Sequence, residues 1–288
     1  MTSPGTGATQ AAIEHHYDVG ADFYRLWLDP RMVYSCALWP DALDDDLAAA
    51  QLAKLDWHAA SARADGAGRV LDVGCGWGAM LARLRGAHGV GHAVGLTLSS
   101  DQAALAAAGD DPGIEIRLED WRDHRPTAPY DAIVSIGAFE HFARLDLDDA
   151  ARTAVYRQWF DACRSWLAPG GRVSLQTIAY EDFDPATGSE AAFFSEEIFP
   201  ESSLPCLRQI VTASEPGFRV LAVRSDADHY AHTLLLWQRR LEDAKQAAVD
   251  LVGRDTYRRY VRYLRLSRAM FERRVCTLYR ITLERRPG

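Results

Sequence analysis

The feature that most constrains the fold of this chain is a glycine-rich turn within residues 69–80, RVLDVGCGWGAM. The run at 70–73 is apolar except for one acidic residue, and it indicates a buried parallel strand. Gly74, Gly76 and Gly78 then allow the backbone to turn and to approach a ligand without side-chain obstruction. A strand, a glycine turn and a helix in this order are typical of the nucleotide-binding half of a doubly wound sheet, with the ligand at the carboxyl end of the strand.

The spacing of the glycines indicates which ligand to expect. A dinucleotide site has the pattern G-x-G-x-x-G and an acidic residue about 20 residues later that binds a ribose hydroxyl. Here the pattern is G-x-G-x-G, and the next strand pattern, residues 92–97, ends in Thr97 without a carboxylate. Asp72 precedes the turn, where it could orient the loop or lie near a cationic group of the ligand. The pattern favours S-adenosylmethionine, with its positive sulfonium and ammonium groups, over a pyrophosphate, which a helix dipole and basic residues would bind.

The rest of the sheet is predicted by the alternation that follows this turn. Apolar, β-branched runs alternate with helical patterns, which predicts a parallel sheet with helices between its strands. Two further strand patterns near the end of the chain enclose a long helical one. We therefore expect an α/β fold with a seven-stranded, doubly wound, Rossmann-like sheet. Its strands are expected near residues 69–74, 91–97, 113–118, 130–136, 171–178, 218–225 and 274–285.

The remaining segments are expected to cover the sheet. Residues 1–66 are predicted to form an N-terminal helical cap, in which Gly20 separates two short helices and a longer helix follows at about 43–64. Residues 67–288 would form the sheet domain. This domain would carry helical lid insertions that exclude water or enclose an apolar substrate. The lid insertions are predicted near residues 179–217 and 228–272.

Composition argues against several classes of protein. No apolar run approaches the roughly 18 residues of a membrane-spanning helix, and residues 1–9 lack the features of a signal peptide, so we expect a cytoplasmic protein without stable membrane insertion. The five cysteines lie far apart, which indicates neither a disulfide framework nor a metal site. A net charge of −8 argues against nucleic acid as a partner. Residues 239–286 contain 14 Lys or Arg and 6 Asp or Glu, a balance of +8, which we interpret as a solvated helix face.

A candidate for chemistry stands at the end of the fourth expected strand, in the segment 135–142, SIGAFEHF. The carboxyl ends of parallel strands face the same crevice as the glycine turn. Glu140 would therefore lie close to the bound ligand. The alternative is that Glu140 and His141 only form a polar pair at the end of the strand.

Six short motifs occur along the chain in a fixed order. They are Tyr34-Ser-Cys36, Leu71 to Gly78, Gly95 to Ser99 with Gln102, Ser135 to Phe142, Ile198-Phe-Pro200, and His229 to Leu234. Together they resemble the cyclopropane fatty acid synthase family of S-adenosylmethionine-dependent methyltransferases, which includes the mycolic acid methyltransferases. The likeness runs from about residue 15 to residue 285, and it implies a class I methyltransferase sheet.

The resemblance implies a set of cofactor-binding residues. Glycines would allow close approach of the cofactor, an amide would recognise its hydroxyl groups, and an indole ring would stack beside its adenine. Asp72, singled out above, is added to this set. The positions that match family contacts to S-adenosylmethionine are Tyr34, Ser35, Gly74, Gly76, Thr97, Leu98, Gln102, Trp121 and Ile136.

The resemblance also implies a bicarbonate ion that acts as the base near the transferred methyl group. Cys36 and Ile178 would contact it through their backbone, and Glu140 and Tyr230 through their side chains. The family has a histidine in a His-Thr-Ile sequence where this chain has Gln176-Thr-Ile178. A glutamine amide donates a hydrogen bond but cannot gain positive charge or relay a proton. We therefore expect weaker binding of bicarbonate, or its replacement by Glu140 or by water.

The function implied is methyl transfer from S-adenosylmethionine to an alkene carbon, through a carbocation that then loses a proton. The substrate would be an unsaturated acyl chain, with an acyl carrier protein as a candidate partner, and the product a cyclopropane or a methyl or methylene branch. Tyr34, Phe139 and Tyr230 are expected to face the cation. The alternatives are C-methylation of a soluble small molecule, such as an isoprenoid, and, from another class, a NAD-dependent oxidoreductase.

Overall fold

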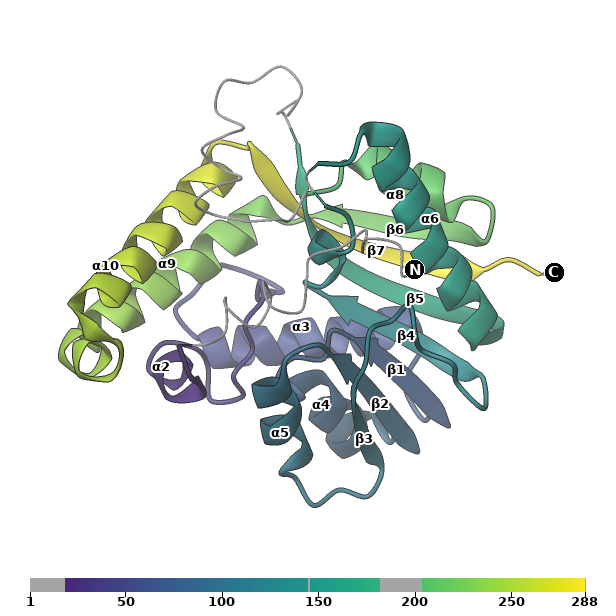
Figure 1. Ribbon diagram of the computed structural model, residues 1–288, viewed down its shortest axis with the longest axis horizontal. Coiled ribbons are helices and arrows are strands. Elements are labelled where there is room, and N and C mark those ends of the chain that lie inside the picture. The colour runs from purple at the N-terminus through teal and green to yellow at the C-terminus, as the bar shows by residue number, and fades with distance from the viewer. Residues whose placement is uncertain (1–18, 145, 182–203, 288) are drawn as a thin grey trace, which may run out of the picture.

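The computed structural model describes residues 19–144, 146–181 and 204–287 (Figure 1). A single sheet of seven strands crosses the molecule, and the strand predictions are confirmed. The strands are β1 (Arg69–Val73), β2 (His92–Thr97), β3 (Ile114–Leu118), β4 (Tyr130–Ile136), β5 (Leu167–Tyr180), β6 (Phe218–Ser225) and β7 (Cys276–Arg285).

The strand order creates the crevice in which a ligand is expected. The order is β3-β2-β1-β4-β5-β7-β6, and β7 runs antiparallel to both of its neighbours. β1 pairs in parallel with β2 on one side and with β4 on the other, so the chain changes direction across the sheet between β1 and β4. In doubly wound sheets, ligands bind at the carboxyl ends of the strands at such a switch point.

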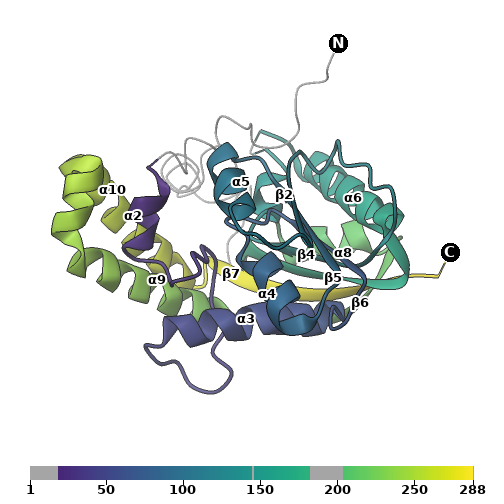
Figure 2. The same cartoon turned by 90° about the horizontal axis from the view of Figure 1, so that it is seen from below.

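Helices cover both faces of this sheet (Figure 2). α3 and α4 pack on one face with the apolar side chains of β1 and β4, and α6 and α8 pack on the other with β1, β2 and β5. The helices of the described residues are α2 (Ala21–Arg25), α3 (Leu47–Ala62), α4 (Ala79–His88), α5 (Ser100–Ala107), the 3-10 helix η1 (Phe139–His141), α6 (Asp149–Trp166), α8 (Leu207–Ser214), α9 (Ala227–Asp243) and α10 (Lys245–Glu272).

Some boundaries differ from the predictions for local reasons. β5 begins at Leu167, before the strand expected at 171–178, through a pairing with β4 that shifts register, and Gly170 within it has a φ of 76°. α4 begins at Ala79 because Gly78, with a φ of 87°, is its N-cap. Gly20 precedes α2 as expected. The predicted helix before Gly20 and part of the lid near 179–217 lie outside the described residues.

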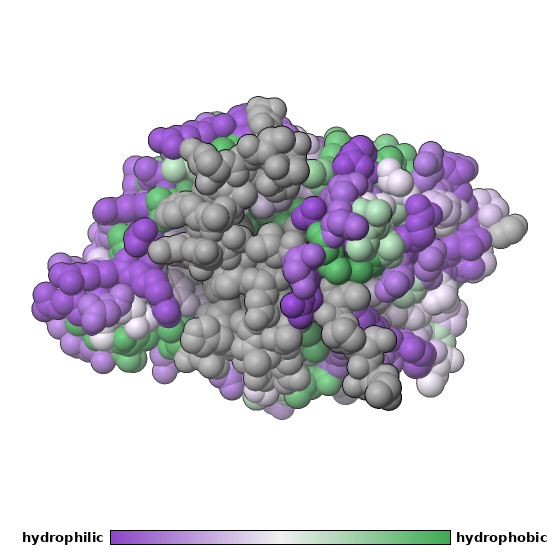
Figure 3. All heavy atoms as spheres, turned by 45° about the horizontal axis from the view of Figure 1, so that its top comes forward, coloured by the Kyte–Doolittle hydropathy of each residue, from purple (hydrophilic) through white to green (hydrophobic). Residues whose placement is uncertain are grey.

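α9 and α10 form a hairpin that leaves the sheet after β6 and returns at β7 (Figure 1). Its inner surface packs with α2 and with the loop before α3 in one cluster rich in aromatic rings. Hydrophilic side chains cover the far end of the hairpin on the face shown in Figure 3. Arg258 and Arg259 of α10 are exposed. Among the described residues, no helix is both long and apolar enough to cross a bilayer.

Candidate active site

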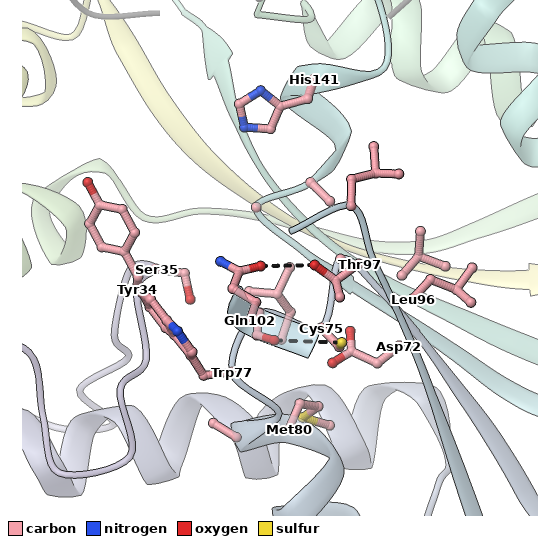
Figure 4. A pocket seen from close by; sticks show the side chains of 18 of the residues that line it. Tyr34, Ser35, Asp72, Cys75, Trp77, Met80, Leu96, Thr97, Gln102 and His141 are labelled. Atoms are coloured by element: carbon pink, nitrogen blue, oxygen red, sulfur yellow. Dashed lines mark hydrogen bonds between the residues drawn. The ribbon is translucent and has the colours of Figure 1, made fainter. Parts of the chain in front are cut away.

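A pocket of about 1130 Å³, counting its open mouth, lies where the loops after β1, β2, β3 and β4 converge (Figure 4). The sequence analysis selected its cofactor-binding residues from separate motifs, and the fold brings all of them to this one pocket. They are Tyr34, Ser35, Asp72, Gly74, Gly76, Thr97, Leu98, Gln102, Trp121 and Ile136.

The glycine loop forms the floor of the pocket. Its backbone takes conformations that would be strained in residues other than glycine. Gly74 has a φ of 84°, and its N–H and that of Cys75 both donate to the Leu96 carbonyl at 2.9 Å. A Cβ atom on Gly74 would lie 2.4 Å from the Cβ of Ala138. Gly76 has a φ of 54°, and no atom lies within 4 Å of the position its Cβ would take. The loop therefore presents bare backbone to any ligand above it.

On the β2 side, hydrogen bonds fix the direction of an amide. The Thr97 hydroxyl donates to Oε1 of Gln102 at 3.0 Å, and Ser99, the N-cap of α5, accepts from the Gln102 backbone N–H. Figure 4 shows the amide nitrogen of Gln102 pointing away from Thr97 into the hollow. Because its oxygen is already bonded, Gln102 is set to donate to a hydroxyl group of a ligand.

Trp121 is buried in the wall contributed by the loop after β3. Its ring lies 5.4 Å from that of Phe142, and the Arg122 guanidinium lies 5.1 Å above it. These contacts hold the indole in place as a flat surface for an aromatic ligand group.

Asp72 is an acidic residue of the pocket with an incomplete set of hydrogen bonds. Its side chain is buried, and its Oδ1 has no hydrogen-bond partner among the described residues. Burial raises its pKa to about 7, and the nearby Lys54 opposes this shift. A buried acceptor in this state favours a cationic donor from a ligand.

Lys54 and His141 also line the pocket, although neither was predicted to bind the ligand. Burial lowers the pKa of His141 to about 4, so its ring is neutral near pH 7. Lys54 lies on the buried face of α3 with Leu47, Gln51 and His58. The helical spacing of these four residues could have indicated a buried face of the helix. Because three of them are polar, the spacing was not recognised as a buried face.

Glu140 lies on η1, between the pocket-lining residues Ala138 and His141. Its Oε1 accepts a 2.6 Å hydrogen bond from the backbone N–H of Ile178, while its Oε2 has no partner among the described residues. Burial raises the pKa of this carboxyl group to about 7. The Ile178 N–H that was expected to contact bicarbonate is thus bonded to the protein itself.

Gln176 is held from two sides by residues that the sequence analysis did not select. Its Oε1 accepts from Nε of Arg280 at 2.9 Å and contacts Nε2 of His58 at 3.2 Å. Nδ1 of His58 lies 2.7 Å from the Ser174 hydroxyl. Burial, with Arg280 and Lys54 nearby, lowers the pKa of His58 well below its usual value, so the imidazole is neutral.

Arg280 corrects the interpretation of the basic segment. It was counted in the solvated helix face, but it lies on β7 and is completely buried. It forms an ion pair with Asp226 and donates to the carbonyl groups of Cys36 and Ala37, at 3.3 and 2.9 Å. The backbone carbonyl of Cys36, a residue expected to contact bicarbonate through its backbone, therefore accepts a hydrogen bond from Arg280.

The aromatic residues expected near a cation separate into two groups. Tyr34 lines the pocket and packs on Trp237, and Tyr230 of α9 also contacts Trp237. Phe139 is instead fully buried beneath the other face of the sheet, with its ring stacked on Tyr156 at 4.5 Å. The expectation for Phe139 is therefore wrong, because it packs in the core.

Comparisons with known proteins agree with this geometry. The family model described as "Mycolic acid cyclopropane synthetase" matches residues 6–281. The chain is 34% identical to "Cyclopropane mycolic acid synthase 3" of Mycobacterium tuberculosis, over 95% of this chain and 96% of that protein. It is 34% identical to "Hydroxymycolate synthase MmaA4" of the same species, over 88% and 85% of the two chains. The crystal structure of mycolic acid cyclopropane synthase CmaA1 complexed with SAH and CTAB superposes with a TM-score of 0.84 and 32% identity, over 96% of this chain and 99% of that one.

Proposed function

Because this chain belongs to the mycolic acid cyclopropane synthetase family of S-adenosylmethionine-dependent methyltransferases, we propose that it transfers a methyl group to an alkene carbon of an unsaturated acyl chain. The observation that carries this proposal is the position of Glu140, a buried carboxyl group flanked by residues of the pocket. The family membership sets aside the NAD-dependent oxidoreductase.

The pocket residues fit S-adenosylmethionine. The unpartnered oxygen of Asp72 suits the cofactor's ammonium group, the amide of Gln102 suits a ribose hydroxyl, and the face of Trp121 suits adenine. Tyr34, Ser35, Leu98 and Ile136 would complete the enclosure, and Gly74 and Gly76 would let the ligand pass close to the backbone. When bound, the cofactor supplies a methyl group made electrophilic by its positive sulfur.

Of the groups expected to hold bicarbonate, the Ile178 N–H is already bonded to Glu140, so an anion there would have to displace this bond. The amide oxygen of Gln176 accepts from Arg280, which leaves the NH2 group of Gln176 as the donor toward an anion. We infer that Oε2 of Glu140 takes the proton that the substrate loses after methylation, because it is an unpartnered acceptor with a pKa of about 7.

The apolar cluster beneath α9 and α10 suits the acyl chain. Tyr34 and Tyr230 join this cluster to the pocket through Trp237, and their rings would stabilise positive charge on the substrate carbon. We propose that residues 1–66 act as a cap, and that residues 67–288 form the methyltransferase domain with lids near 179–217 and 228–272. The acyl chain would arrive on an acyl carrier protein or in a lipid.

Methyl-labelled S-adenosylmethionine tests this proposal. The protein would be incubated in separate reactions with oleoyl-acyl carrier protein, with vesicles of an unsaturated phospholipid, and with a prenyl diphosphate. We expect label in the acyl product and a mass gain of one CH2, and NMR would distinguish a ring from a branch. Label only in the prenyl reaction would support the alternative, methylation of a soluble small molecule.

A further inference from the structure

We propose that Lys54 binds the carboxylate of the methionine part of the cofactor, opposite Asp72, which binds its ammonium group. This inference rests on the proposed function, and it assigns the residue that selects a ligand with an intact amino-acid end.

The first observation is the surroundings of Lys54. This residue is 1% exposed, and its Nζ donates one hydrogen bond of 2.7 Å to the Ser35 hydroxyl. Both residues line the pocket. An ammonium group has three N–H donors, so this buried cation holds donors in reserve for an acceptor inside the pocket.

The second observation is that the opposite charge is also incomplete. Asp72 lines the same pocket, is 2% exposed, and has an oxygen without a partner among the described residues. Figure 4 shows Ser35 and Asp72 on opposite sides of the hollow. An incomplete donor and an incomplete acceptor across one hollow match the two ends of a zwitterion, the carboxylate and ammonium of an amino acid.

Electrostatics explains why this arrangement would select for the zwitterion. Burial and the nearby Arg280 guanidinium lower the pKa of Lys54 to about 7, and burial raises that of Asp72 to about 7. Charge on either group is therefore costly without a ligand, although each group partly offsets this cost for the other. A carboxylate beside Lys54 and an ammonium beside Asp72 would restore the charged forms of both, so binding strengthens when both ligand groups are present.

The test compares two ligands that differ only at the amino-acid end. S-adenosylhomocysteine carries it and 5′-methylthioadenosine lacks it. By calorimetry, we expect Lys54→Met to weaken binding of S-adenosylhomocysteine by about 10- to 100-fold, the loss of one charge-assisted hydrogen bond. Binding of methylthioadenosine should change less than about two-fold, because this ligand has no carboxylate for Lys54 to bind. The matched control is Lys245→Met, because Lys245 is exposed and is the only other lysine of the chain.

A second measurement keeps Lys54 in place. In the Lys245→Gln protein labelled with carbon-13 at lysine Cε, the single remaining signal reports the titration of Lys54. We expect saturating S-adenosylhomocysteine to raise the pKa of Lys54, and methylthioadenosine to leave it where it is. This experiment does not depend on the folding of a Lys54 variant.

The outcomes separate the two proposals. Equal loss of affinity for both ligands in Lys54→Met, no loss for either, or a Lys54 titration that S-adenosylhomocysteine does not shift would overturn this inference and leave the methyltransferase function standing. Wild-type protein that binds neither ligand would overturn both.

Discussion

Glu140 is buried, its Oε1 accepts from the Ile178 N–H, and its Oε2 has no hydrogen-bond partner among the described residues, which suits a residue that accepts a proton. We expect Glu140→Gln to lower kcat by about 10²- to 10⁴-fold, the range for loss of a general base. The glutamine still offers Oε1 to the Ile178 N–H, so affinity for S-adenosylhomocysteine should stay within about two-fold. The wild-type rate should rise with pH through about 7, because the carboxylate is the active form. A variant with full activity would exclude Glu140 as the base.

The same carboxyl group should also affect stability in a pH-dependent way. Its pKa is about 4.5 in the unfolded chain and about 7 in the fold, so the folded state binds more protons between these values. The free energy of unfolding therefore falls as pH rises through this window. Glu140→Gln lacks this pH dependence. We therefore expect the free energy of unfolding of the variant, relative to that of wild type, to be about 3 kcal/mol higher at pH 8 than at pH 4.5. Denaturant unfolding at both pH values measures this, and a pH-independent difference would contradict it.

At this scale, sequence reasoning found residues that stand next to recognisable motifs and missed those that act through distant partners. Gln176 was identified as a departure from the family pattern. Its partners His58 and Arg280 come from α3 and β7, and sequence separation hides such contacts. Arg280 was misassigned because it was counted together with the exposed arginines of α10, such as Arg258 and Arg262, whereas it lies on β7 between two strands.

At the scale of elements, the turn between β1 and α4 has two glycines with different requirements. Gly74→Ala would force a Cβ to 2.4 Å from Ala138 at a φ of 84°, whereas Gly76→Ala would meet only the cost of its φ of 54°. We expect a loss of about 1 to 2 kcal/mol of unfolding free energy for Gly76→Ala and a larger loss for Gly74→Ala. Thermal unfolding of the two variants tests the order, and equal losses would show that the Ala138 contact relaxes.

The elements themselves were predictable because hydrophobic period is a local property. Runs such as that of β1 are apolar enough to be recognised without any partner. The start of β5 was not, because residues 167–171 join the sheet through an irregular pairing with β4 that their Pro-Gly-Gly sequence would normally exclude. The position of Phe139 was also not predictable, because a residue just after the end of a strand can lie on either face of the sheet.

At the scale of the whole molecule, the Arg280–Asp226 ion pair joins β7 to the start of α9, and Arg280 also binds the loop at residues 36–37. We expect Asp226→Leu to lower the free energy of unfolding by about 3 to 5 kcal/mol, because Arg280 is left without its carboxylate. Adding Arg280→Met should recover part of this loss. A double-mutant cycle by urea unfolding measures the coupling, and strictly additive losses would contradict it. The control Arg224→Met removes a half-exposed partner of Asp226 and should cost less than about 1 kcal/mol.

The α9–α10 hairpin starts and ends on neighbouring strands, β6 and β7, so its two attachment points are already fixed by the sheet. Lengthening or shortening the far end of the hairpin would leave both attachment points unchanged. The length of the hairpin can therefore vary through inserted or deleted helical turns at its far end without any change in the strand order of the sheet.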